Sequence, residues 1–454
     1  MSQLSIEDSQ VRGSLTWWLK RPWRVLVGLW RRDPEYLARL GLLRLMGVPL
    51  PETVAPLSLT SADASSSVVS VRDLLTRSLP NLVPIVTYPD PGPTTTGRLT
   101  ILTDTISSGS LFGGVGTAIL FGAALARHRG LRLRVVTRHD EPEPGNFGAI
   151  LAAHGAAFDE NVEFECASTV ADARGLAVFS GDLVLTTSWW TTWAALQSFD
   201  PACIVYLLQD DERMFYPAGD LQLRCREIFC DPRLRFVVNT SALLKHLVDA
   251  GMTGVARRGI SFEPAFPLAI YYREPKSPAG KRRFFFYARP NNPRNLFLRG
   301  LEAVAGAVEN NCFPEAEWEL EFVGRNIPDI QLPRNVRPRI STSLSWHDYA
   351  ALIRQVDVGL SLMLTPHPSY PPLDLAASGA VVVTNRYGPK QSLESYCANI
   401  LCVEPSVNDL VGALGHAVAL ATNETRRLSN YENACINRDW DEAFAPVLTV
   451  LGEL

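Results

Sequence analysis

The sequence lacks the features that would place a protein across a membrane, in the secretory pathway or on nucleic acid. No uninterrupted apolar run is long enough to span a bilayer. Polar residues follow Met1, so we expect no secretory signal peptide. The formal net charge is only −4, which excludes the strong positive field that attracts nucleic acid. These absences predict a cytoplasmic protein that binds no nucleic acid.

The sequence also lacks the spacings that bind metals or form disulfide frameworks. Its eight cysteines include no Cys-x-x-Cys pair. Several lie inside apolar runs, as Cys203 does, which favours buried free thiols in a reducing compartment. Asp210 and Asp211 are adjacent, so they do not form the Asp-x-Asp motif of manganese-dependent enzymes.

The length of 454 residues predicts two domains with extensions. Residues 11 to 47 hold an unusual mixture, namely Trp17, Trp18, Trp23 and Trp30 beside Lys20, Arg21, Arg24, Arg31 and Arg32. Such a helix suits the headgroup region on the inner face of a membrane, or it packs on the protein's own surface, and both interpretations stay open. Residues 58 to 70 resemble a linker, and the Pro- and Gly-rich stretch Tyr88–Thr96 marks a boundary.

Two successive runs of short apolar strands and helices follow this boundary. The first has strands at 99–103, 133–137, 183–186, 204–208 and 236–238, with a helix at 117–127. The second has strands at 284–288, 318–323, 358–363 and 381–384, with helices at 296–308 and 373–378 and a helix start at Ser345. Such alternation predicts parallel sheets covered on both faces. We therefore expect an α/β protein with two Rossmann-like domains facing a cleft.

The predicted limits follow from these runs. They are an amino-terminal extension over residues 1–96, a first Rossmann-like domain over 97–270 that binds the acceptor, a second over 271–430 that binds the donor, and a terminal helix over 431–454 that packs back on the first domain.

Arg289 and Arg294 lie five positions apart in a Pro- and Asn-rich loop after the strand at 284–288. Arginine offers permanent charge and paired donors, which suit a diphosphate. Solvated loop arginines are the alternative. Further along, Pro371 and Pro372 predict the first turn of a helix whose free amides would face a phosphate. Asp374 lies early in this helix, where it either accepts a hydrogen bond from a sugar hydroxyl or stabilises the helix dipole.

The first domain offers further candidates. The run Gly113-Gly114-Val115-Gly116-Thr117 precedes a helix and allows close approach of a phosphate. A dinucleotide site is the alternative, with Asp140 as its acidic residue, but Ile119 replaces the third glycine of that fingerprint. Trp189 and Trp190 follow a strand and either stack on acceptor sugars or pack in the core. Asp210 and Glu212 also follow a strand, where acids often point into a cleft.

The two motifs of the second domain together resemble the nucleotide-sugar half of retaining GT-B glycosyltransferases. In that family an Arg and a Lys five residues apart follow the first strand, and a Glu-x7-Glu element comes later. Arg289 takes the Arg position, Arg294 the Lys position and Asp374 that of the second Glu. The first Glu position holds Pro366, so the resemblance leaves the sugar contact to His367, Ser369 and Tyr370.

More specific phrases resemble bacterial rhamnosyltransferases of the WsaF type over about residues 97 to 440. These phrases are Gln209-Asp210-Asp211-Glu212, Phe215-Tyr216-Pro217, Tyr287-Ala288-Arg289-Pro290 and His367-Pro368-Ser369-Tyr370-Pro371-Pro372. The resemblance implies transfer of rhamnose from dTDP-rhamnose to a glycan or lipid-linked glycan, with retention of configuration, in cell-surface polysaccharide synthesis. It also implies a metal-independent enzyme without a cofactor, in which arginines stabilise the leaving diphosphate.

The resulting hypothesis assigns three sets of residues. The catalytic set is Arg289, Arg294 and Asp210; the donor set is Arg289, Arg294, Gly324, Ser369, Tyr370, Asp374, Gly114 and Gly116; and the acceptor set is Trp189, Trp190 and Glu212. The competing hypotheses are an NAD-dependent oxidoreductase and a non-catalytic glycan-binding or scaffold protein of the same fold.

Overall fold

The computed structural model describes residues 69–90, 97–107, 113–158, 161–168, 175–179, 181–275, 280–342 and 344–452. The chain divides into two units, residues 1–78 and 79–454. In the first unit the structure describes helix α4 (Val71–Ser78). The tryptophan-rich segment at 11–47 lies outside the described residues, so its attachment to a membrane stays a prediction.

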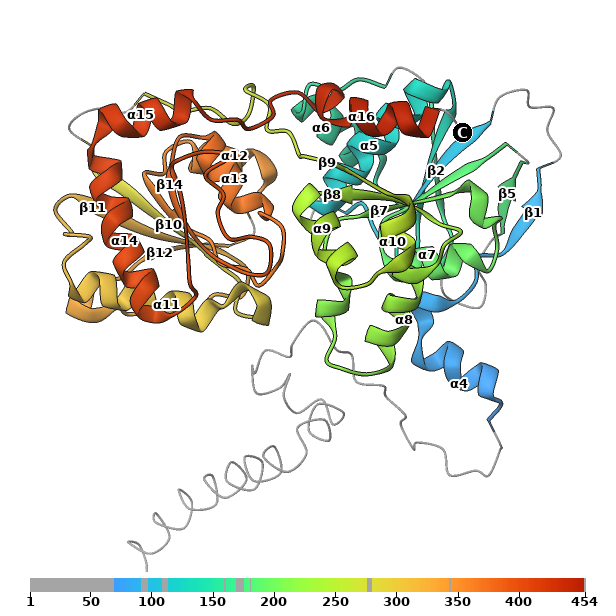
Figure 1. Cartoon of the computed structure of the whole chain (residues 1–454), viewed down its shortest axis with the longest axis horizontal. Coiled ribbons are helices and arrows are strands. Elements are labelled where there is room, and N and C mark those ends of the chain that lie inside the picture. The colour runs from blue at the N-terminus through green and yellow to red at the C-terminus, as the bar shows by residue number, and fades with distance from the viewer. Residues whose placement is uncertain are drawn as a thin grey trace, which may run out of the picture. The chain divides into compact units, whose positions relative to one another are not determined.

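The second unit contains a seven-stranded parallel sheet in the order β4-β3-β2-β6-β7-β8-β9 (Figure 1). Its strands are β2 (Arg98–Thr103), β3 (Arg132–Thr137), β4 (Val162–Cys166), β6 (Leu183–Thr186), β7 (Ile204–Leu208), β8 (Arg235–Asn239) and β9 (Gly259–Phe262). The covering helices are α5 (Gly114–Arg129), α6 (Pro144–Ala153), α7 (Trp189–Leu196), α8 (Asp220–Cys230), α9 (Ser241–Asp249) and α10 (Thr253–Arg258). The strand order reverses between β2 and β6, and ligands of such sheets bind beyond the carboxyl ends at that point.

A second parallel sheet has the order β12-β11-β10-β13-β14-β15 (Figure 1). Its strands are β10 (Arg282–Ala288), β11 (Trp318–Gly324), β12 (Arg339–Thr342), β13 (Val358–Leu360), β14 (Val381–Asn385) and β15 (Ile400–Val403). Its helices are α11 (Phe297–Glu309), α12 (Trp346–Ile353), α13 (Tyr370–Ala377), α14 (Val407–Thr422) and α15 (Glu424–Glu432). The strand order reverses here between β10 and β13.

Each sheet is buried on both faces because its strands alternate side chains between two apolar clusters. In β10, Phe284 and Phe286 belong to the cluster under α11 and α14, whereas Phe285 belongs to the cluster under α12 and α13. In β2, Leu99 and Ile101 face α5. The two sheets confirm the predicted GT-B class of two Rossmann-like folds. None of the helices in the described ranges combines the length and the apolar content that a membrane span requires.

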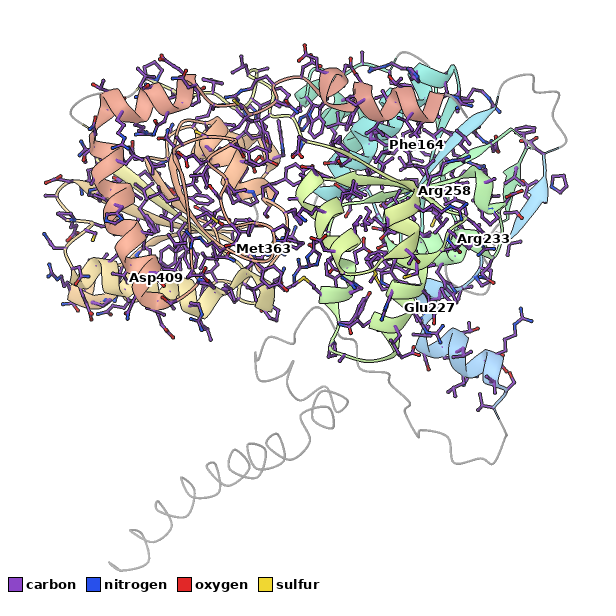
Figure 2. All side chains as sticks on the ribbon, viewed as in Figure 1. Phe164, Glu227, Arg233, Arg258, Met363 and Asp409 are labelled. Atoms are coloured by element: carbon purple, nitrogen blue, oxygen red, sulfur yellow. The ribbon has the colours of Figure 1, made fainter. Side chains whose placement is uncertain are left out.

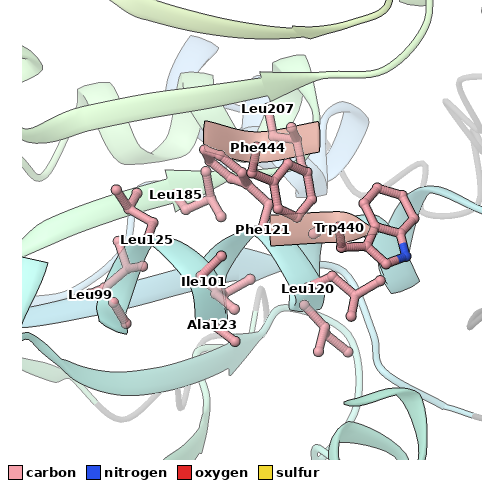
Figure 3. Packing of buried hydrophobic residues seen from close by; sticks show 14 of the residues in the cluster. Leu99, Ile101, Leu120, Phe121, Ala123, Leu125, Leu185, Leu207, Trp440 and Phe444 are labelled. Atoms are coloured by element: carbon pink, nitrogen blue, oxygen red, sulfur yellow. The ribbon is translucent and has the colours of Figure 1, made fainter. Parts of the chain in front are cut away.

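The last helix, α16 (Trp440–Gly452), packs on the first sheet although it follows the second in the chain. Figure 3 shows Trp440 and Phe444 among the core side chains Leu120, Phe121 and Leu207. Phe444 is fully buried and meets the Phe121 ring edge to face at 5.2 Å between centroids. The helix therefore closes the core of the first sheet.

The chain passes between the two sheets twice, and the two passages are joined to each other. Ala265 pairs with Asn437 as a parallel bridge, and the Phe266 amide donates to the Asn437 carbonyl at 2.7 Å. Arg438 Nη1 donates to the carbonyls of Phe266 and Tyr271 at 3.1 and 3.0 Å. The connection between the sheets is thus a hydrogen-bonded pair of segments.

Residues 79–90 belong to the second unit, although the sequence placed them in an extension ending at residue 96. Strand β1 (Thr87–Pro89) pairs with β5 (Leu176–Val178) in a small parallel sheet, and Ile85 is buried in the core. The prolines of this stretch indicate a loop in the sequence. They concealed strand β1, which can include Pro89 because proline is tolerated at sheet edges.

The position of α16 leads to a prediction about stability. Phe444→Ala should lower the free energy of unfolding by about 3–5 kcal/mol, because it leaves a cavity in the core of the first sheet. Val450→Ala on the same helix should change it by less than about 0.5 kcal/mol, because Val450 is 48% exposed. Urea unfolding followed by circular dichroism measures both, and equal stabilities would contradict the packing of α16 described here.

Candidate active site

A cavity of about 290 Å³ lies where the carboxyl ends of the second sheet meet the first turn of α5. Six of the predicted donor residues line it: Gly116, Arg289, Gly324, Ser369, Tyr370 and Asp374. The remaining lining residues include Gly113, Thr117, His154, Tyr271, Arg325, Trp346, Tyr349 and Trp440. The structure thus gathers most of the predicted donor set at one place, but Arg294 and Gly114 do not line the cavity.

The floor of the cavity depends on Gly324, the last residue of β11. A Cβ at this position would lie 1.7 Å from the Ala288 carbonyl oxygen on β10. Only glycine can therefore occupy this place beside the loop that begins with Arg289. The Arg289 side chain lies at the cavity wall, where its Nη1 donates to the Tyr287 hydroxyl at 3.2 Å.

Asp374 presents a buried carboxylate oxygen to the cavity. Its Oδ2 accepts from the Tyr349 hydroxyl at 3.3 Å, whereas its Oδ1 is buried without a hydrogen-bond partner in the described part of the chain. Burial raises the pKa of Asp374 to about 7, although the neighbouring hydroxyls of Tyr349 and Tyr271 oppose the rise. An unsatisfied buried acceptor is costly, so Oδ1 is suited to a hydroxyl group of a ligand.

Helix α13 begins one residue earlier than predicted, at Tyr370, and this changes its expected role. Pro371 and Pro372 have no N–H group, so the predicted row of phosphate-binding amides is absent from this first turn. The amide of Ser369 donates to His367 Nδ1 at 3.1 Å. Ser369 adopts a φ of 68°, which turns the chain sharply into the helix beside the cavity. The Tyr370 amide is the donor that remains in the first three helical positions.

The first turn of α5 offers the amides that α13 lacks. Gly114, Val115 and Gly116 occupy its first three positions, and Gly113 precedes them with a φ of 74°. Helix starts of this kind bind anions through free amides and the positive end of the dipole. Gln209 Nε2 donates to the Gly114 carbonyl at 2.7 Å and fixes the turn against the loop after β7. Gly114 therefore supports the turn, while Gly116 faces the cavity.

Arg294 is bound to Asp210, which explains why it does not line the cavity. Its Nη2 donates to both carboxylate oxygens at 2.9 and 2.7 Å, and its Nε donates to the Leu364 carbonyl at 3.2 Å. The guanidinium also lies over the Phe215 ring at 5.1 Å. Arg294, which the sequence pairs with Arg289 as a diphosphate ligand, instead reaches Asp210 of the first sheet and shares its charge there.

Asp210 has further partners from the loop after β13. Thr365 Oγ1 donates to its Oδ1 at 3.1 Å, and His367 Nε2 lies 3.4 Å from the same atom. Because His367 Nδ1 accepts the Ser369 amide, its Nε2 carries the proton that faces Asp210. Burial would raise the pKa of Asp210, but His367 and Arg294 hold it well below its ordinary value. A carboxylate with so low a pKa is a poor general base.

Three successive carbonyls fix the loop that carries His367. The Leu362 carbonyl accepts from Asn295 Nδ2 at 3.0 Å, and the Leu364 carbonyl accepts from Arg294. The carbonyl of Met363 (Figure 2) accepts from Asn385 Nδ2 and from Lys390 Nζ, both at 3.0 Å. Burial lowers the pKa of Lys390 to about 8. Sequence reasoning missed Lys390, because no local pattern marks a lysine that folds onto a distant carbonyl.

Trp189 and Glu212 belong to the core, and the prediction that they bind an acceptor is wrong for this structure. Trp189 is 1% exposed, and its indole N–H donates to the Tyr216 hydroxyl at 3.0 Å. Glu212 accepts the Trp189 amide at 2.8 Å and so satisfies the start of α7. Burial raises the pKa of Glu212 to about 8. Both residues fix the loop after β7 to the loop after β6.

Trp190 is only half-buried, but it too has a partner within the protein. Its indole N–H donates to both carboxylate oxygens of Asp104 at 2.9 Å. Burial raises the pKa of Asp104, against the effect of this hydrogen bond. Asp104 follows β2 at the point where the strand order reverses. The pair lies at the predicted acceptor end of the first sheet, outside the lining of the cavity.

Several aromatic residues at the cavity were not singled out from the sequence, and three of them lie close together. His154 follows α6, Trp346 begins α12 and Trp440 begins α16. Trp440 Nε1 donates to His154 Nδ1 at 3.0 Å, and the His154 and Trp346 rings lie 5.4 Å apart. Burial lowers the pKa of His154 to about 4, so its ring is neutral at physiological pH. The three come from distant segments, and hydrophobic periodicity alone would place each of them in the core.

Among the described residues, no group of three or more His, Cys, Asp or Glu side chains could hold a metal ion. The cysteines that the structure describes are free thiols.

Comparison with known proteins assigns the two sheets to one family. The N-terminal domain model of WsaF matches residues 98–223, and the C-terminal domain model of WsaF matches residues 282–415. The two matches cover more than half of the chain. The chain belongs to the WsaF-like glycosyltransferases. This membership replaces the oxidoreductase alternative.

A relative and two solved structures extend the comparison. The O-antigen biosynthesis protein RfbC of Myxococcus xanthus is 30% identical over 345 residues, which are 71% of this chain and 25% of RfbC. The chain thus spans about a quarter of that relative's length. The structure of Anabaena HepE with UDP and glucose has a TM-score of 0.55 at 16% identity, and it covers 78% of this chain and 99% of HepE. A Rickettsia africae glycosyltransferase has a TM-score of 0.51 at 10% identity over 79% of this chain and 99% of its own. Both share the fold.

The burial of Asp374 predicts how stability depends on pH. Its folded-state pKa of about 7 exceeds its ordinary value of 3.8, so unfolding releases a proton between these pH values. Asp374 therefore costs the wild-type protein stability as pH rises from about 4 to about 7. Asp374→Asn should lack this loss, so its melting temperature should rise relative to wild type between pH 5 and pH 8. Glu212 also has a raised pKa, but it adds the same pH dependence to the stability of both proteins, so its effect is absent from the difference between them. If the difference in melting temperature between the two proteins did not change with pH, the raised pKa of Asp374 would be contradicted.

Proposed function

We propose that this protein transfers a sugar from a nucleoside diphosphate to a growing glycan, and that the cavity between α5 and α13 binds the donor. The observation that carries the proposal is the combination of Arg289 with the unpartnered Oδ1 of buried Asp374 at one cavity. A nucleotide sugar needs a cation for its diphosphate and an acceptor for a hydroxyl. The cavity supplies both.

The diphosphate would lie between Arg289 and the first turn of α5. Arg289 provides permanent charge from the second sheet, and the first turn of α5, of which Gly116 lines the cavity, provides amide donors from the first. Negative charge grows on the diphosphate as the bond to the sugar breaks, so these donors would act most strongly in the transition state. In this role α5 replaces the amides that the two prolines remove from α13.

The Asp374 carboxyl and the aromatic rings would contact different parts of the donor. Asp374 Oδ1 would accept a hydroxyl of the sugar or of the ribose. The flat rings of His154, Trp346 and Trp440 would lie against the base, because aromatic faces stack on nucleobases. A neutral His154 suits this position, since a pyrimidine carries no charge for it to pair with.

Asp210 and Arg294 would position the donor loop. Arg294 fixes the Leu364 carbonyl and Asp210 fixes Thr365 and His367, so the pair sets the path of the chain into Ser369 and α13. The low pKa of Asp210 argues against proton abstraction by its carboxylate. In a retaining reaction no enzyme base is needed, because a donor phosphate oxygen can accept the proton of the attacking hydroxyl.

We further propose dTDP-rhamnose as the donor, with retention, and a surface polysaccharide or its lipid-linked precursor as the acceptor. Membership of the WsaF-like family and the similarity to an O-antigen biosynthesis protein support this choice. A panel of nucleoside diphosphates in a thermal-shift assay would identify the base, because a ligand stabilises the folded state by mass action. Nuclear magnetic resonance of the product's anomeric proton would establish retention or inversion.

Arg289→Ala tests the proposed donor site. It should lower kcat/KM by about two to three decades, equivalent to about 2–4 kcal/mol of transition-state stabilisation. Arg282→Ala is the matched control, because Arg282 begins the same strand and is 3.9 Å from its nearest acidic partner, Glu317. Steady-state transfer measures both, with circular dichroism to confirm folding. Wild-type rates from folded Arg289→Ala protein would sink the proposal, as would the absence of transfer with every donor tested.

A further inference from the structure

Tyr370 connects the two sheets at the edge of the cavity. It is the first residue of α13, and its ring packs against the core cluster of the first sheet as well as that of the second. The ring lies 6.0 Å from that of Phe266, which belongs to one of the passages between the sheets. Tyr370 is therefore placed to respond to the separation of α13 from α5.

The hydroxyl of Tyr370 belongs to a directed chain of hydrogen bonds. Asn239 Nδ2 can only donate, and it donates to Tyr370 Oη at 2.9 Å. Thr117 Oγ1 donates its single proton to the Gly113 carbonyl at 3.1 Å. Tyr370 Oη and Thr117 Oγ1 also share a hydrogen bond, and because the Thr117 proton is already used, Tyr370 must donate in it.

The chain ends on the turn that carries the α5 amides. The Gly113 carbonyl receives both the hydroxyl and the amide of Thr117, each at 3.1 Å. Gly113 has a positive φ, which glycine adopts without steric cost, and these contacts help to hold its carbonyl in place. Thr117 and Asn239 are 2% and 3% exposed, which shields the chain from water.

We propose that Tyr370 is a positioning residue whose hydroxyl couples the approach of α13 to the orientation of the first turn of α5. This inference rests on the proposed function, because the turn is where we place the donor diphosphate. The hydroxyl does not bind the donor: its proton goes to Thr117, and it accepts from Asn239. The chain forms when the two sheets come together and is broken when they separate.

Amide hydrogen exchange in the ligand-free protein tests the coupling without reference to catalysis. Tyr370→Phe keeps the ring and removes the hydroxyl, so exchange should accelerate about tenfold in peptides covering residues 113–120, as expected for loss of one buried hydrogen bond. Thr117→Val should have the same effect, and Thr117→Ser, which keeps the hydroxyl, should restore slow exchange. Tyr272→Phe, which loses only a 3.5 Å contact to Glu274, is the control. Unchanged exchange in Tyr370→Phe would overturn the proposal.

Transfer kinetics distinguish positioning from direct contact with the donor. Tyr370→Phe and Thr117→Val should each lower kcat/KM about tenfold, and the double variant should lose no more than either single one, because both break the same chain. The ratio of kcat/KM between two different donor sugars should not change. Additive losses, or an altered ratio, would overturn the proposal. A wild-type protein that transfers no sugar would refute the proposed function, while the exchange experiment would still decide the coupling.

Discussion

The ion pair between Asp210 and Arg294, whose side chains are only 14% and 11% exposed, is the constraint on which the site depends. Asp210 follows a strand of the first sheet, and Arg294 follows a strand of the second. A buried charge is tolerated only when it is paired and hydrogen-bonded, so each residue requires the other. The same two side chains hold the loop after β13 through Leu364, Thr365 and His367. The Asp210–Arg294 ion pair thus links the two sheets and also holds the loop that leads into α13.

The distribution of hydrogen-bond donors around the cavity follows from the residues that each helix begins with. Helix α13 begins with a tyrosine and two prolines, so its positive end has few free backbone N–H groups. Helix α5 begins with two glycines and a valine, which leaves the donors accessible. The asymmetry means that the free helix amides and the Arg289 cation come from different sheets. A diphosphate held there would draw one group from each side.

Much of the fold could be predicted from the sequence, because parallel strands buried on both faces leave long apolar signals. Strands such as Phe284–Ala288 and helix starts such as Ser345 were found within a residue or two. Strands β4, β9, β12 and β15 were missed, and Glu163 and Arg339 interrupt the apolar character of β4 and β12. The gathering of Arg289, Ser369 and Asp374 follows from the sheet topology, which places carboxyl ends at one edge.

The partners of the charged residues could not be predicted in the same way. Arg294 and Arg289 look equivalent in the sequence, and only the position of Asp210 separates a paired cation from one that faces the cavity. Trp189 and Glu212 are residue types that often bind sugars, yet both are buried and hydrogen-bonded to each other within the core. His154, Trp346 and Trp440 meet only after three distant segments have packed. Contacts between residues so far apart in the chain leave no pattern in the local sequence from which they could be predicted.

The double passage between the sheets determines which movements the protein can make. Ala265 and Asn437 join the two segments side by side. A connection of two paired segments is stiffer than a single flexible linker. Such a connection bends about one axis but resists twisting and sliding, because either would shear the hydrogen bonds from Arg438 and Phe266. Any separation of the two sheets would therefore be guided along a restricted path. Such guidance would preserve the register between the loops at their carboxyl ends.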